Sequence, residues 1–87
     1  MSVPSLPRGV RLHEDAVRQA TVLLGPERAL ILDDTGTAIL REIDGQRSIA
    51  MIAQTLAQRY QAPVDAVLAD VTRYLSQLAT RRLIDLA

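Results

Sequence analysis

The sequence predicts an α+β domain of the winged-helix type, in which a three-stranded antiparallel sheet precedes three helices. Two observations carry this prediction. Residues 10–32 contain short alternating or apolar segments separated by turn residues, and residues 33–80 show helical periodicity after side chains that can cap helices. The 87 residues are enough for one domain with one modest core. Aliphatic side chains must fill that core, because Phe and Trp are absent and only Tyr60 and Tyr74 are aromatic.

The first eight residues are expected to form an extended, partly mobile arm that takes no part in strand pairing. Pro4 and Pro7 lack the N–H group that a strand ladder or a helix interior requires. The folded domain is therefore expected to comprise residues 9–87. The beginning of the chain lacks the apolar region of a secretory signal, and no apolar run approaches the roughly 18 residues of a membrane span. These features favour a cytoplasmic location.

Three strands are expected in the first part of the domain. Val10–His13 alternates apolar and polar residues, and Glu14–Ala16 is expected to turn the chain into a second strand at Val17–Leu24. Gly25-Pro26 then ends this strand, and Arg28–Leu32 supplies a third, aliphatic one. A sheet of three short strands cannot cover its own apolar face, so the segments that follow are expected to cover it.

Three helices are expected to provide that cover. Asp33-Asp34-Thr35 offers capping oxygens to a first helix that runs to about Ile43. Ser48 caps a second helix, whose apolar residues follow the helical period as far as Tyr60. Pro63 suits the first position of a third helix. The apolar stripe of this helix is Val64, Val67, Leu68, Val71, Leu75 and Leu78, and the apolar tail Leu83–Leu86 follows it.

The charges and the missing residue types exclude several functions. Ten arginines balance ten acidic residues, so the chain lacks the long-range field that draws proteins onto nucleic acids or anionic membranes. We expect neither kind of partner. The absence of cysteine excludes disulfides, thiolate nucleophiles and sulfur-ligated metals.

No group of residues has the pattern of a catalytic or metal site. His13 is the only histidine, and strand alternation places Arg11 and Asp15 on its side and Glu14 on the other, so these residues cannot close around a metal. The adjacent carboxylates of residues 33 and 34 diverge, and capping explains them better than acid–base catalysis. We therefore expect no enzymatic activity and no cofactor.

Two other functions stay open at this point. The second and third helices have helix-turn-helix spacing, so a winged-helix DNA-binding regulator is the alternative function. Asp65 and Asp70 argue against it, because they lie in the part of the third helix that would approach phosphates. Arg81 and Arg82 are expected in the last turn of the third helix, where positive charges interact favourably with the helix dipole. Contact with an anionic partner is the alternative role for them. A free strand edge also allows a homodimer.

Four segments of the sequence resemble the PqqD family, whose members are peptide chaperones of pyrroloquinoline quinone (PQQ) biosynthesis: Gly9–His13, Val22–Arg28, Leu32–Leu40 and Ile43–Ile49. The resemblance extends from Pro7 to Leu86. It implies three strands followed by three helices, and a domain that binds a ribosomal precursor peptide and presents it to a radical S-adenosylmethionine enzyme. This enzyme cross-links Glu and Tyr side chains of the peptide. The sequence departs from the family by lacking an aromatic residue at Gln19–Thr21 and a glycine near Arg82.

The resemblance also implies a peptide site beside the third strand and over the last helix. The matching positions are Arg28, Ala29, Leu30, Ile31, Leu32 and Asp33 on the strand and Leu68, Val71, Leu75, Leu78 and Arg82 on the helix. The apolar members either line a groove or belong to the core, and the sequence leaves both open. If Leu75 lines the groove, Leu75→Arg should weaken peptide binding and leave the helical content intact.

Overall fold

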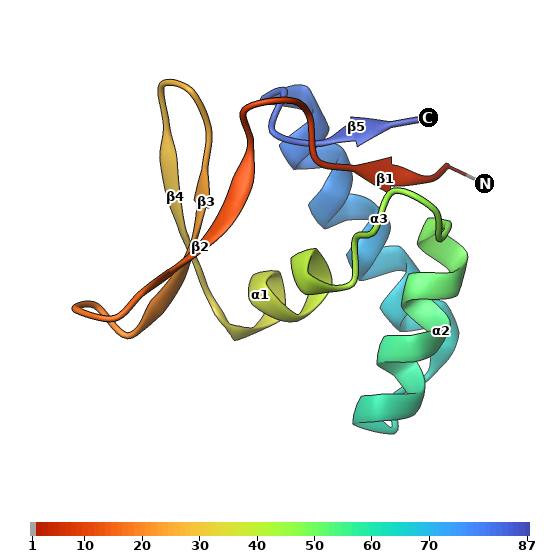
Figure 1. Ribbon diagram of the computed structural model, residues 1–87. Helices are drawn as coiled ribbons and strands as arrows, with labels where there is room; N and C mark the ends of the chain where they lie inside the picture. Colours follow the sequence, from red (N-terminus) through yellow and green to blue (C-terminus); the bar gives the residue numbers. More distant parts are fainter. Residues whose placement is uncertain (1) are drawn as a thin grey trace.

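The computed structural model describes residues 2–87 and contains the predicted sheet and the predicted helices (Figure 1). The strands are β1 (Pro4–Ser5), β2 (Arg11–Asp15), β3 (Ala20–Leu24), β4 (Ala29–Leu32) and β5 (Asp85–Leu86), and the helices are α1 (Asp34–Arg41), α2 (Ile49–Tyr60) and α3 (Val64–Thr80). β2, β3 and β4 form an antiparallel sheet in that order. The predicted α+β class is confirmed.

The first hairpin is shifted from its predicted position. β2 continues to Asp15, and the turn occupies residues 16–19, so the second strand begins at Ala20 and not at Val17. The Asp15 carboxylate builds this turn, because its Oδ1 accepts the backbone N–H groups of Val17 and Arg18 at 3.1 and 3.2 Å. Gln19 completes the turn in the left-handed region, with φ of 52°. Such an aspartate-built turn has no Asn-Gly signal in its sequence.

The predicted N-terminal arm is part of the fold, so the prediction that its prolines keep it out of strand pairing was wrong. β1 pairs antiparallel with β5, with Pro4 opposite Leu86. Val3 and Ala87 exchange two backbone hydrogen bonds of 3.0 and 3.1 Å, which makes the Pro4 position a non-hydrogen-bonded one. The missing N–H of Pro4 therefore faces away from the partner strand, where proline is tolerated. Met1, the first residue of that predicted arm, lies outside the described residues.

The helices begin as the capping residues predict and end slightly earlier. The backbone N–H of Gly36 donates to Asp33 Oδ1 at 2.7 Å, and Ser48 caps α2 in the same way. α1 stops at Arg41, two residues before the predicted Ile43. Pro63 precedes the first residue of α3 and does not occupy it. These differences of one or two residues are typical of helix boundaries.

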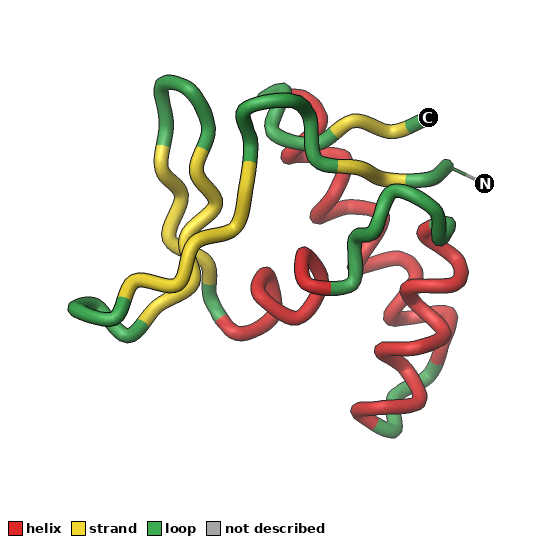
Figure 2. The backbone as a smooth tube through the Cα atoms, viewed as in Figure 1, coloured by secondary structure: helices red, strands yellow, loops and turns green. Residues whose placement is uncertain are grey.

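The core lies between the sheet on one side and the α2–α3 pair on the other, and α1 spans the space between them (Figures 1 and 2). β3, β4 and all three helices contribute buried side chains to it, and Leu12 of β2 packs against it. The buried members are Val10, Leu23, Leu32, Ile39, Leu40, Ile49, Ile52, Leu56, Val71, Leu75, Leu78, Leu83 and Ile84. Because these side chains are all aliphatic, the helices are held against the sheet by burial of apolar area, without aromatic stacking.

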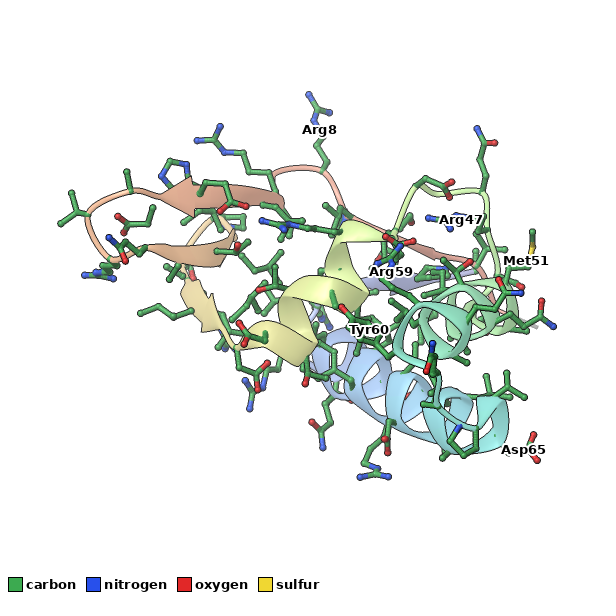
Figure 3. The ribbon with its side chains drawn as sticks, turned by 90° about the horizontal axis from the view of Figure 1, so that it is seen from below. Arg8, Arg47, Met51, Arg59, Tyr60 and Asp65 are labelled. Carbon is green, nitrogen blue, oxygen red and sulfur yellow. The ribbon has the colours of Figure 1, made fainter. Side chains whose placement is uncertain are left out.

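Two polar clusters fix α1 in this arrangement. Glu14 on β2 accepts hydrogen bonds from the hydroxyl of Thr21 on β3 and from the guanidinium of Arg41 on α1. The Arg41 contact, and then the Thr21 contact, lower the pKa of Glu14. Directly after Arg41, the mostly buried carboxylate of Glu42, the C-cap residue of α1, lies 3.4 Å from both Arg47 and Arg59, whose side chains converge in Figure 3. α1 is therefore linked to the sheet and to α2.

Candidate functional site

The three-stranded sheet has two open edges of different character. At one edge, β2 carries Arg11, His13, Glu14 and Asp15. Charged edge strands resist pairing with a foreign strand. At the other edge, β4 consists only of the apolar residues Ala29–Leu32, and among residues 2–87 it pairs with β3 alone. β4 is therefore the edge suited to receive another strand.

Hydrogen bonding in the β3–β4 hairpin determines which residues of β4 are free. The N–H of Gly25 donates to the C=O of Arg28 at 2.8 Å, so this pair is a hydrogen-bonded one. Hydrogen-bonded and non-hydrogen-bonded pairs alternate along an antiparallel ladder. The alternation leaves Ala29 and Ile31 with their N–H and C=O groups toward the open edge, whereas the residues that alternate with them bond to β3.

A groove of about 270 Å³ lies between β4 and α3. Its lining residues are Leu30, Ile31, Leu32 and Asp33 on the strand side, and Tyr74, Gln77 and Leu78 of α3 with the C-cap residue Arg81 on the helix side. These four helix-side residues recur at i, i+3, i+4 and i+7, so they follow one face of the helix. The side chain of Ile31 is 55% exposed, whereas most of the large aliphatic side chains of the domain are buried in the core. The open edge and the groove therefore adjoin each other.

The structure brings together some of the residues that the sequence analysis placed at the site. Five of them line the groove: Leu30, Ile31, Leu32, Asp33 and Leu78. Arg28 and Ala29 are exposed at the start of β4. Val71 and Leu75 are not on the groove wall but in the core, with 1% and 0% of their surface exposed. Leu68 is half-buried against that core, and Arg82 is exposed beyond the end of α3.

The sequence analysis missed three residues that the groove uses, Tyr74, Gln77 and Arg81. They lie next to the apolar stripe of α3, on the side of the helix that borders the sheet. The signal that could have found them is helical spacing counted from Leu78, since residues 74 and 81 lie four positions before it and three after it. The stripe itself marks the side of α3 that faces the core.

Tyr74 lines the end of the groove nearest α1. Its hydroxyl occupies the space that a side chain on Gly36 would need, so the glycine in the first turn of α1 makes room for the ring. Burial of the half-buried ring raises the pKa of Tyr74, and the negative charge of Asp33 raises it further. The neutral phenol is therefore favoured in the folded domain.

This shift can be measured directly, because a Tyr60→Phe variant leaves Tyr74 as the only tyrosine. We expect its absorbance near 295 nm to titrate with a midpoint above the ordinary 10.0 in the folded domain. The sign follows from the raised pKa: the stabilising contribution of Tyr74 is complete below pH ~10 and is lost as the pH rises through the raised value. Adding Asp33→Asn, which keeps the helix cap, should lower the midpoint. A midpoint at or below 10 would contradict the described burial.

Other kinds of site find no support in the described part of the chain. Among residues 2–87, no three His, Cys, Asp or Glu side chains converge in a way that holds a metal ion. None of the helices in that range has both the length and the apolarity needed to cross a membrane. Asp65 and Asp70 are exposed in the N-terminal half of α3, where a DNA-reading helix would approach phosphates.

Comparison with known proteins gives relatives along almost the whole chain. The family model described as Coenzyme PQQ synthesis protein D (PqqD) matches residues 20–84. The chain is 46% identical over 85 residues to the PqqA binding protein of Rhizobium meliloti (strain 1021), covering 98% of this chain and 87% of that protein. It is also 46% identical over 83 residues to the bifunctional coenzyme PQQ synthesis protein C/D of Methylorubrum extorquens. That match covers 95% of this chain and 22% of the longer protein.

Two solved structures share the fold. The first is the solution NMR structure of the PqqD truncation of Methylobacterium extorquens PqqCD, described as a functional and stand-alone recognition element for ribosomally synthesized and post-translationally modified peptides. It has a TM-score of 0.82 and 46% identity, and the match covers 95% of this chain and 88% of that one. The second is the crystal structure of PqqD from Xanthomonas campestris, with a TM-score of 0.63, 40% identity, and 91% and 88% coverage. The chain belongs to the PqqD family of coenzyme PQQ synthesis proteins.

Proposed function

We propose that this chain is a non-catalytic peptide chaperone of PQQ biosynthesis, which binds the ribosomal precursor peptide as an added strand on β4. It then presents the peptide to a radical S-adenosylmethionine enzyme. The observation that carries this proposal is the open, wholly apolar β4 edge beside the groove of about 270 Å³. The names of the relatives support it, since one is a PqqA binding protein and another contains a peptide recognition element.

Backbone pairing and the groove contribute differently to such binding. The free N–H and C=O groups of Ala29 and Ile31 allow about four hydrogen bonds to a guest strand, each contributing roughly 0.5–1.5 kcal/mol net. Ordering about five guest residues costs roughly 1–2 kcal/mol for each residue. Pairing alone therefore does not give tight binding. The affinity must come from apolar guest side chains in the groove, at about 25 cal/mol per Å² buried.

The direction of the guest follows from the packing of β4 against α3. Leu83, beyond the end of α3, lies against Gly25 ahead of β4, whereas Tyr74 lies beside Asp33 after it. β4 and α3 therefore run in opposite directions. Antiparallel pairing is the more stable and more frequent arrangement, so we assign the guest a direction opposite to β4. Its N-terminal end then lies at the Asp33 end of the groove and its C-terminal end near Arg81.

A peptide bound in this way stays accessible to an enzyme. The guest becomes the new edge strand, and its outer edge and solvent-facing side chains remain open. The Methylorubrum extorquens relative, named as a bifunctional protein C/D, joins a matching segment to a longer synthesis protein, which fits a domain that works beside an enzyme. The radical enzyme would thus receive a peptide held at one edge only, with the rest of its chain free.

Titration of a fluorescein-labelled PqqA peptide with the full chain tests the proposal. We expect the anisotropy to saturate in the micromolar range, and a scrambled peptide of the same composition to bind at least tenfold more weakly. A flat titration up to high micromolar protein would contradict the proposed function. In a cross-linking assay with the radical enzyme, product should form faster when the chain is present.

The same open edge also suits pairing with a second copy of this chain, since strand pairing at β4 needs only an extended apolar segment. Sedimentation velocity with and without peptide distinguishes the two uses. If β4 serves the peptide and does not pair with a second copy, the sedimentation coefficient should not fall with dilution, and peptide should not dissociate a dimer. A dimer that peptide disperses would show that both partners compete for β4.

A further inference from the structure

We propose that a second pocket, open to the surface and lined by α1, α2 and α3, takes one apolar side chain of the same peptide, N-terminal to the segment that pairs with β4. This inference rests on the proposed function. The pocket has a volume of about 250 Å³, and its apolar walls are Ala38, Ile39, Leu56, Val67 and Val71. Small-molecule sites usually enclose roughly 300–1,000 Å³, so a pocket of this size suits a single side chain better than a cofactor.

The pocket and the β4 groove follow one another along α3. The pocket uses Val67, Asp70 and Val71, and the groove begins at Tyr74 and ends at Arg81. Their centres are separated by about eight helical residues, or roughly 12 Å at 1.5 Å per residue. An extended peptide covers that distance with about four residues. One peptide can therefore fill both sites, with the ring of Tyr74 between them.

The charges at the pocket and at the far end of the groove also favour one peptide that runs antiparallel to β4. Asp34 and Asp70 lie at the pocket, whereas Arg81 lines the far end of the groove and Arg28 precedes β4. Within residues 2–87, no oppositely charged group approaches Asp34, Arg28 or Arg81 to within 4 Å. Asp70 shares its carboxylate with Arg73 at 3.2 Å. A guest antiparallel to β4 with a basic residue near its pocket anchor and an acidic residue at its C-terminal end complements both.

The aromatic residues support a binding role for both cavities. The chain has only two, and each lines one cavity: Tyr74 the groove and Tyr60 the pocket. Tyr60 is 59% exposed at the end of α2 and lies beside α1 (Figure 3). Tyrosine gives a large apolar contact with a polar tip at low conformational cost, and it is enriched where proteins bind partners. Tyr74 is only partly buried against the core and Tyr60 is exposed, so both rings keep surface that a guest can contact.

A pocket-filling variant tests the inference in the full chain. Ala38→Leu adds three carbons inside the pocket, and Ala69→Leu adds the same carbons at an exposed position of α3 outside both cavities. With labelled PqqA peptide as the probe, we expect Ala38→Leu to raise Kd about tenfold, equivalent to one lost aliphatic anchor. Ala69→Leu should bind like the unchanged chain.

Alanine substitutions along the peptide locate the anchor. In the unchanged chain, alanine at one apolar peptide residue, about four positions N-terminal to the residue in the groove, should raise Kd. The same peptide substitution should no longer change the Kd for Ala38→Leu, because the pocket is already filled. Substitutions at other peptide positions should change Kd equally with both chains. In the unchanged chain, the methyl NMR signal of Ala38 should shift on adding peptide while that of Ala69 stays. An unchanged Kd in Ala38→Leu together with a stationary Ala38 signal would overturn the pocket and leave the proposed function standing. Absence of saturable binding by the unchanged chain would overturn the proposed function itself.

Discussion

Replacing Ile31 with proline is expected to abolish tight peptide binding while the domain stays folded. In the free protein the Ile31 N–H faces the open edge of β4 and bonds to no other strand, so its loss removes nothing from the β3–β4 ladder. In the complex, the same N–H donates to the guest, and the pyrrolidine ring would occupy the space where the guest backbone approaches. We expect Kd to rise about 30-fold or more, equivalent to two or three lost hydrogen bonds.

Two control variants separate the backbone effect from the side chain and from the fold. Ile31→Ala removes the exposed aliphatic group but keeps the N–H, so it should weaken binding less than Ile31→Pro. Leu30→Pro removes an N–H that bonds to β3, and its free energy of unfolding should fall by several kcal/mol, whereas that of Ile31→Pro changes by about 1 kcal/mol or less. Urea titrations and peptide anisotropy give these values. Equal Kd values for Ile31→Pro and Ile31→Ala would show that the guest does not pair with β4.

The sheet and helices could be predicted because local signals mark most of their ends. Asp33 and Ser48 cap helices with side-chain oxygens, and Gly25 with the following proline ends β3, so each boundary depends on residues adjacent in sequence. The β1–β5 pair had no such signal. Its two strands are two residues long, lie at opposite ends of the chain, and gain their stability from packing and from the Val3–Ala87 hydrogen bonds. Periodicity does not report contacts of this range.

The candidate site was predictable to the level of elements but not to the face of the helix. The resemblance indicated β4 and α3, and both border the groove. Helical periodicity locates the apolar stripe of α3, and an apolar stripe is first of all the side that faces the core. Because α3 packs against α2 and also borders β4, the residues at the margin of the stripe, such as Tyr74 and Arg81, line the groove. Only the packing of all the elements shows which margin stays open.

Leu75 provides the sharpest test of that distinction, and Leu75→Arg is expected to unfold the domain. The side chain is fully buried in the core cluster, with 0% of its surface exposed. Truncating a buried leucine to alanine already costs about 2–5 kcal/mol, and an arginine adds the cost of burying a charge. Domains of this kind have a total stability of about 5–15 kcal/mol. Circular dichroism should show loss of helical signal, and Ser76→Arg, at the neighbouring exposed position, should keep it.

The outcome decides whether the helical face was assigned correctly. If Leu75 lined the groove, the arginine would extend into solvent, helical content would be intact, and only peptide binding would suffer. The structure places Leu75 in the core and not on the wall of the groove. We therefore expect Leu75→Arg to lose peptide binding only because it loses the fold. A native spectrum with binding lost would move Leu75 to the peptide surface and rotate the binding face of α3 away from Tyr74, Gln77 and Arg81.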